Sequence, residues 1–162
     1  MDYLWTPWRY QYLAAGSRTD GCVFCIAGQD AANDRQHLVI YRASYNFVIL
    51  NRFPYTSGHL MIVPYQHASA LGDLPEETTV EVMTLARAVE RHLKALYRPD
   101  GLNMGINLGA SAGAGIAGHL HLHALPRWTG DANFMTAVAN TRTLPETIED
   151  SAEKVRAAWV HQ

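Results

Sequence analysis

The stretch His119-Leu120-His121-Leu122-His123-Ala124-Leu125-Pro126 alternates imidazole and apolar side chains with a period of two residues. Successive side chains of a β-strand point to opposite faces, so the alternation predicts a strand over 119–126 with the three imidazoles on one face, about 6.5–7 Å apart. Leu120, Leu122 and Ala124 then face the core. A surface strand that is rich in histidine by chance is the alternative interpretation, but packing alone accounts poorly for three histidines in strict alternation.

Apolar runs elsewhere in the chain predict the rest of a sheet. Alternation and turn residues predict four further strands, over 37–42, 46–50, 59–64 and 102–108. The polar stretch 28–36 is expected to be a loop.

Two helices are expected around these strands. Pro75 and the acids after it open a long helix over 75–97, whose predicted apolar face comprises Val80, Met83, Leu85, Ala86, Val89 and Leu93. His92 on this helix is expected to occupy a solvated or rim position, and the segment 145–160 is also helical in pattern. The element order predicts an α+β domain with a five-stranded antiparallel sheet, one long helix and a C-terminal helical segment.

Length and charge narrow the class of protein. The 162 residues, 48% hydrophobic and 17% charged, are expected to form a single domain over 1–162. Within it we distinguish an aromatic segment 1–20, a cysteine segment 21–36, a core 37–128 and a C-terminal segment 129–162. No stretch approaches ~20 apolar residues, which predicts a cytoplasmic protein without a membrane partner. The net charge of −2 gives no general attraction to nucleic acid.

The histidine strand and the segment before it suggest phosphate chemistry. Imidazole is suited to nucleophilic attack and proton transfer near neutral pH, and its attack on phosphorus gives a phosphoramidate that a second acceptor can cleave. The preceding loop over 109–115, Gly-Ala-Ser-Ala-Gly-Ala-Gly, offers backbone N–H groups with little steric hindrance. Such loops can surround phosphate oxygens, so the two features together favour a phosphorylated ligand.

Cys22 and Cys25 form the other group of interest, because they are the only cysteines of the chain. The Cys-x-x-Cys spacing supplies two ligands, whereas a structural zinc site takes four. A redox pair and two inert thiols are the alternatives, although the βαβ pattern around a thioredoxin-like pair is missing. The candidate partners are the histidines at 37, 59, 67, 92, 119 and 161.

The histidine stretch resembles the signature of the histidine-triad (HIT) family of nucleotide hydrolases and transferases. The similarity extends to NRFPYTSGHLMIVPYQH over 51–67 and to PRW over 126–128, and it runs from about Leu4 to the C-terminal segment. The chain is most similar to the bacterial CxxC-containing branch, with an LWxPWR start and a PRWxGDxNFM tail. That branch includes diadenosine tetraphosphate phosphorylases and hydrolases. The resemblance implies the HIT-like fold.

The resemblance also implies roles for individual residues. His121 would attack the α-phosphorus as nucleophile, His123 would orient it, and His59 would be a fourth histidine at the same pocket. Asn51 would hold the ribose hydroxyls, although on its own it is a typical turn residue before Pro54. Asn107 would begin the phosphate loop. The other implied nucleotide- or phosphate-binding residues are Gly113, Ala114, Gly115 and Trp128.

A metal ion and a dimer follow from the same resemblance. CxxC-bearing relatives hold zinc with two cysteines and two histidines, which here implies Cys22, Cys25, His67 and His119. Such a site would join the N-terminal segment to the histidine strand in a structural role. Many HIT proteins are dimers, and the aromatic terminal segments supply a plausible homodimer interface.

The function implied is cleavage of diadenosine polyphosphates, with diadenosine tetraphosphate preferred, through a nucleotidyl-His121 intermediate. Many members carry Gly-Gln-Ser/Thr before the triad, where this chain has Gly115 and Ile116. Our hypothesis is that the changed loop leaves room for inorganic phosphate as second acceptor, giving phosphorolysis to ATP and ADP; with water the reaction is hydrolysis. The alternative function is a nucleotide-binding regulator with little turnover. A zinc carrier or redox protein would leave the phosphate loop unexplained.

Overall fold

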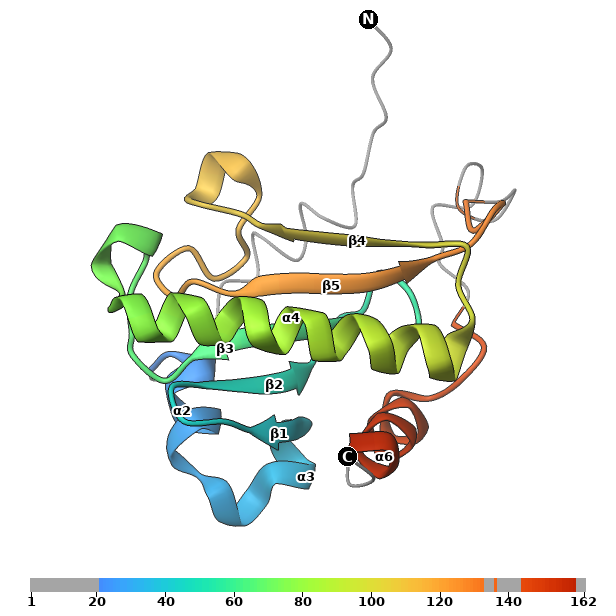
Figure 1. The fold of residues 1–162 in the computed structure, drawn as a ribbon, viewed down its shortest axis with the longest axis horizontal. Helices are drawn as coiled ribbons and strands as arrows, with labels where there is room; N and C mark the ends of the chain where they lie inside the picture. The colour runs from blue at the N-terminus through green and yellow to red at the C-terminus, as the bar shows by residue number, and fades with distance from the viewer. Residues whose placement is uncertain (1–20, 133–135, 137–143, 160–162) are drawn as a thin grey trace, which may run out of the picture.

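The sheet of this protein has five antiparallel strands in the order β1-β2-β3-β5-β4 (Figure 1). The structure is a computed structural model that describes residues 21–132, 136 and 144–159. The strands are β1 Val39–Arg42, β2 Asn46–Leu50, β3 Leu60–Pro64, β4 Gly101–Ile106 and β5 Leu122–Arg127. All four neighbouring pairs are antiparallel, which confirms the predicted fold class. The aromatic segment 1–20 lies outside the described residues.

The strand predictions are right in number and shifted at the ends. β2 has the predicted bounds, whereas β1 begins at Val39 and β4 ends at Ile106. The largest correction concerns the histidine stretch, because β5 begins only at Leu122 and its registered pairs with β3 and β4 also start there. His119 and His121 therefore lie in the segment before the strand. The N–H of Leu120 binds the carbonyl of Ala68 instead of a neighbouring strand.

The long helix α4, Glu76–Tyr97, packs along one face of the sheet, with Pro75 just before it (Figure 1). Leu85, Ala86, Val89 and Leu93 are buried as predicted. Val80 and Met83 are exposed by 58% and 60%, so their assignment to the apolar face was wrong. Val82 is buried instead. It lies with Leu85 and Val89 on the face of the helix that packs into the core. The C-terminal helix α6, Ile148–Trp159, packs against α4 and β1.

The stretch predicted as a loop over 28–36 is mostly helical. It contains the end of α2 (Val23–Gln29), the turn η1 (Ala31–Asn33) and the start of α3 (Asp34–His37). The side chain of Arg42 explains why this polar stretch is ordered, because it donates to the carbonyls of Ala27 (2.6 Å) and Gly28 (2.7 Å) and to the carboxylate of Asp34. Two further short turns are η2, Leu71–Asp73, and η3, Ala110–Ala112. None of the described helices is long and apolar enough to cross a membrane.

The pairing register sorts the side chains of β5 between the two faces of the sheet. Leu122 and Ala124 are buried in the core that also contains the apolar residues of α4. The intervening His123 is paired with Met61 of β3 and with Gly105 of β4 and points to the opposite face. His123 therefore lies on the face of the sheet away from α4.

Candidate active site

His59, His121 and His123 lie together, although 64 residues separate the first from the last. His59 precedes β3 and His123 lies in β5, and the pairing of these strands brings Nε2 of His59 to 2.9 Å from Nδ1 of His123. The rings of His121 and His123 are 4.7 Å apart and steeply inclined, at 72°. His59 is fully buried and His121 is 5% exposed. The sheet thus assembles three imidazoles at one place.

Hydrogen-bond partners define which nitrogen of each ring carries a hydrogen. The N–H of Tyr55 donates to Nδ1 of His59 at 3.1 Å, so the hydrogen of neutral His59 is on Nε2. That Nε2–H then donates to Nδ1 of His123, which leaves the hydrogen of His123 on its own Nε2. His123 therefore has an N–H available for an anionic ligand.

His121 has the opposite tautomer. Its Nδ1 lies 2.8 Å from the carbonyl oxygen of His119, which can only accept, so Nδ1 carries the hydrogen. Nε2 of neutral His121 consequently has a lone pair. Burial lowers the pKa of His121, which favours this neutral form. A buried, neutral imidazole with one nitrogen held by a carbonyl has the properties required of a nucleophile.

His123 is also neutral near physiological pH. Burial, and to a smaller extent the neighbouring His121, lower the pKa of His123 to about 4. A charged His123 would repel a charged His121, and neither would be well solvated. The histidine cluster thus offers one lone pair and one N–H donor without carrying a net charge.

Asn51 and Tyr55 support the buried His59. The side-chain oxygen of Asn51 accepts the N–H of Phe53 at 3.0 Å, and its amide nitrogen lies 3.3 Å from Nδ1 of His59. Asn51 is therefore the turn residue that its sequence context suggested, and it also contacts a site histidine. Tyr55 was missed by the sequence analysis, although its ring lies 4.8 Å from that of His59 and 6.2 Å from that of His123. Its place in the Pro-Tyr-Thr-Ser-Gly-His stretch was the available signal.

The residues predicted to bind phosphate lie near the start of β5. Asn107 follows the last residue of β4, Ile106, which pairs with Leu122. In the glycine-rich loop, Gly113 donates its N–H to the carbonyl of Ala110 at 2.9 Å and Ala114 donates to Gly109 at 3.4 Å. Gly115 follows and is exposed. Phosphate binding through the amide of Gly113 or Ala114 therefore requires the loop to rearrange.

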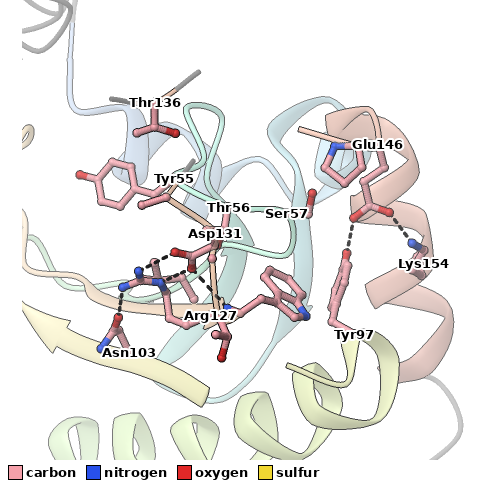
Figure 2. A pocket seen from close by; sticks show the side chains of 16 residues that line it. Tyr55, Thr56, Ser57, Tyr97, Asn103, Arg127, Asp131, Thr136, Glu146 and Lys154 are labelled. Carbon is pink, nitrogen blue, oxygen red and sulfur yellow. Dashed lines mark hydrogen bonds and ion pairs between the residues drawn. The ribbon is translucent and has the colours of Figure 1, made fainter. Parts of the chain in front are cut away.

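Trp128 lies beyond the other end of β5 and lines a pocket of about 850 Å³. Figure 2 shows this pocket with Tyr55 and Arg127 on one side and Tyr97 and Glu146 on the other. The cations that line it are paired, Arg127 with Asp131 and Lys154 with Glu146. The hydroxyl of Ser57 is buried at the pocket wall and has no hydrogen-bond partner among the described residues. Tyr55 is shared by the pocket and the histidine cluster.

Cys22, Cys25, His67 and His119 form a second cluster, which can hold a metal ion. Their ligand atoms all lie within 4.8 Å of one another. Nδ1 of His119 is 3.3 Å from Sγ of Cys22 and 3.6 Å from Sγ of Cys25, and Nδ1 of His67 is 3.3 Å from the same Cys25 sulfur. Cys22 directly precedes α2 and Cys25 lies in it, His67 follows β3, and His119 precedes β5.

The donor chemistry of this second cluster fits a metal ion. Nε2 of His119 donates to the carbonyl of Pro64 at 2.9 Å, so its Nδ1 lone pair faces the two sulfurs. A backbone carbonyl on the second ring nitrogen is the usual partner of a metal-bound histidine. Two sulfur and two imidazole donors are a typical ligand set for a structural metal ion.

The exposure of His92 differs from the prediction. It is 6% exposed on α4, and its ring stacks on that of Trp159 in α6 at 4.3 Å, so the expectation of a solvated or rim position was wrong. His37 pairs with Asp30 at 2.9 Å, away from both histidine clusters. His161 lies outside the described residues.

Comparison with known proteins places this geometry among nucleotide-processing enzymes. A family model described as the HIT domain matches residues 32–130. An AP-4-A phosphorylase of Mycobacterium tuberculosis is 38% identical over 168 aligned positions, which cover all of this chain and 86% of that protein. A bis(5'-adenosyl)-triphosphatase of Saccharomyces cerevisiae is 31% identical over 56% of this chain and 44% of that protein. The crystal structure of a Zn-bound histidine triad family protein from Mycobacterium smegmatis has a TM-score of 0.69 and 31% identity, covering 86% of this chain and 94% of that one.

Proposed function

The chain belongs to the HIT family, and from this membership we propose that it cleaves diadenosine polyphosphates, with diadenosine tetraphosphate as the preferred substrate. The full-length similarity to an AP-4-A phosphorylase supports the substrate class. The observation that carries the proposal is the tautomer of His121, whose Nδ1–H binds a carbonyl while Nε2 keeps its lone pair. A nucleotide-binding protein without turnover has no use for a nucleophile held in this way.

The reaction proceeds in two displacements. The lone pair of His121 Nε2 forms a bond to the α-phosphorus, while the bond from that phosphorus to the bridging oxygen breaks and ATP leaves with the electron pair. A second acceptor then attacks the same phosphorus, and the P–N bond breaks with its electrons returning to Nε2. Inorganic phosphate as acceptor gives ADP, and water gives AMP. The Nε2–H of His123 stabilises charge on the phosphoryl oxygens, which is supported by the closeness of its ring to that of His121.

The nucleotide is bound by the residues around this centre. Asn107 and Gly115 bind phosphate oxygens, Gly113 and Ala114 do so after the loop rearranges to free their amides, and Asn51 contacts the ribose. Trp128 and the pocket that it lines bind the part of the substrate that is remote from the reacting phosphorus. The buried hydroxyl of Ser57 supports this assignment, since a polar ligand group in the pocket would satisfy it.

The metal ion at Cys22, Cys25, His67 and His119 is zinc, in a structural role. All four positions are taken by protein ligands, which is typical of structural zinc sites. The Zn-bound relative from Mycobacterium smegmatis supports this identity. When bound, zinc would cross-link three segments of the chain and would take no part in the reaction.

The active form is a cytoplasmic homodimer. Within the described part of the chain, β4 pairs only with β5, so its other edge is available to a second copy. Met104 on this strand is 39% exposed, so a second copy that pairs with this edge would also contact an apolar side chain. Light scattering should give twice the chain mass, and a monomeric mass would contradict the dimer.

The experiment is incubation of the protein with diadenosine tetraphosphate, with and without labelled inorganic phosphate. Phosphorolysis predicts ATP and ADP, with the label in the β-phosphate of ADP, whereas hydrolysis predicts ATP and AMP. His121→Ala should lower turnover by at least about a thousandfold while the protein remains folded. His37→Ala, away from the site, is the control and should retain activity.

Two results would contradict the proposal. Full activity of His121→Ala would exclude the nucleotidyl-histidine intermediate. Tight AMP binding without turnover of any dinucleoside polyphosphate would instead favour the nucleotide-binding regulator.

A further inference from the structure

Phe24 lies between the two cysteines of the metal cluster and against the nucleophilic histidine. It is the third residue of Cys22-Val-Phe-Cys25, and only 4% of it is exposed. Its ring centroid is 4.9 Å from that of His121 and 5.4 Å from that of His119. One apolar ring therefore contacts a member of each histidine cluster.

The ring of His121 is enclosed on two sides. Phe24 contacts it at an interplanar angle of 52°, and His123 contacts it at 72° from 4.7 Å. The single hydrogen bond from Nδ1 to the carbonyl of His119 fixes one atom of the imidazole. A ring held at one atom can still tilt, so the neighbouring rings determine the direction in which the Nε2 lone pair points.

His119 provides the other link between the two clusters. Its ring takes part in the cysteine cluster through Nδ1, and its Nε2 is held by the carbonyl of Pro64. Its own carbonyl accepts the hydrogen bond from His121. The cysteine cluster is thus connected to the nucleophile both by the backbone of His119 and by the ring of Phe24.

We propose that Phe24 is a positioning residue, through which the Cys22–Cys25 segment at the start of α2 holds the His121 ring in line for attack on phosphorus. This inference rests on the proposed role of His121 as nucleophile. Reacting atoms that are displaced by about 1 Å can lose about a hundredfold in rate. The contact acts on the chemical step, because Phe24 is separate from the residues assigned to the nucleotide.

The test compares two identical substitutions at buried phenylalanines. Phe24→Leu should lower kcat by about 10- to 100-fold and leave KM within about twofold of the wild-type value. Phe47→Leu is the matched control, because Phe47 is also a buried phenylalanine and its ring stacks on that of Tyr65 instead of on a site histidine. Phe47→Leu should lower the unfolding temperature but retain kcat. Metal content, measured by mass spectrometry, should be the same in all three proteins.

A second readout reports on the imidazole itself. In wild-type protein, ¹⁵N NMR of the His121 ring should show a protonated Nδ1 and a bare Nε2 in one conformation. Phe24→Leu should give exchange-broadened or multiple signals for this ring, whereas Phe47→Leu should give the wild-type signals. Phe24→Met, which preserves most of the side-chain volume, is the second variant and should show the same loss of kcat.

The outcomes separate this inference from the proposed function. A kcat within twofold of wild type in both Phe24 variants, or a loss confined to KM, would overturn the positioning role. An unchanged His121 spectrum in Phe24→Leu would overturn it as well. Activity that survives His121→Ala would instead refute the proposed function, whatever the Phe24 variants do.

Discussion

At the scale of single residues, His121 and His123 have opposite tautomers and therefore different roles. His121 offers a lone pair at Nε2, and His123 offers an N–H donor. His121 is buried, His123 is half-buried, and both are neutral, but a carbonyl holds Nδ1–H of His121 whereas an N–H donor faces Nδ1 of His123. The resemblance to the HIT family named these histidines from their spacing. It could not give the tautomers, because these depend on the carbonyl of His119 and the amide of Tyr55, whose positions are set by folding. Phe24 was missed for the same reason.

Burial of these histidines makes the stability of the protein depend on pH. The pKa of His123 is about 4 in the folded protein, against about 6.5 for histidine in an unfolded chain. Between these values the unfolded chain binds more protons, so the free energy of unfolding should decrease as the pH falls from about 6.5 to about 4. Burial also lowers the pKa values of His92, His119 and His121, which acts in the same direction.

Calorimetry at pH 7 and pH 5 measures this effect. The unfolding temperature should be lower at pH 5, and His123→Gln should reduce the difference. An unfolding temperature that stays constant or rises on acidification would show that the buried histidines do not control stability in this range.

At the scale of elements, periodicity predicted the long elements well and the short ones poorly. β2 and most of α4 follow from their apolar patterns, since both bury one regular set of side chains. The turns between residues 31 and 37 depend on Arg42, whose contacts with Ala27 and Asp34 join residues 8 to 15 positions apart. The late start of β5 depends on where β3 and β4 end, which alternation within residues 119–126 cannot reveal.

The α4 helix is stabilised by the face that packs on the sheet. Leu93 is fully buried there, whereas Met83 on the same helix is 60% exposed. Leu93→Ala should reduce the free energy of unfolding by about 2–5 kcal/mol, because it leaves a cavity in the core. Met83→Ala should change it by less than about 0.5 kcal/mol.

Urea denaturation of the two variants measures this difference. The slope of the free energy against urea should stay constant, so that only the midpoint moves. Equal effects of the two substitutions would contradict the assignment of the buried face.

At the scale of the whole molecule, the cysteine cluster connects segments that are far apart in the chain. Cys22 and His119 are 97 positions apart, and His67 lies between them in sequence. The family resemblance predicted these four residues as ligands, and they do lie together. Spacing alone left six histidines as candidates, because the paths of the connecting segments decide which imidazoles reach the sulfurs.

Removal of the metal should therefore destabilise the molecule as a unit. A ligand present at a thousand times its Kd stabilises the folded state by about 4 kcal/mol, which for a chain of this size corresponds to on the order of 10 °C in unfolding temperature. A strong chelator should therefore lower the unfolding temperature of the wild-type protein by on the order of 10 °C. Cys22→Ser should already unfold at the lower temperature and respond little to the chelator. A wild-type protein that loses its metal without any change in unfolding temperature would contradict the cross-linking role.

The hydrogen bonds of His59 also set the route that protons can take. The pair His59–His123 ends at the backbone N–H of Tyr55, an amide that keeps its proton throughout the physiological range. An additional proton on His59 would have to bind Nδ1, where the amide of Tyr55 already donates. The backbone of Tyr55 therefore opposes proton transfer from His123 to His59 and keeps both rings in their tautomers.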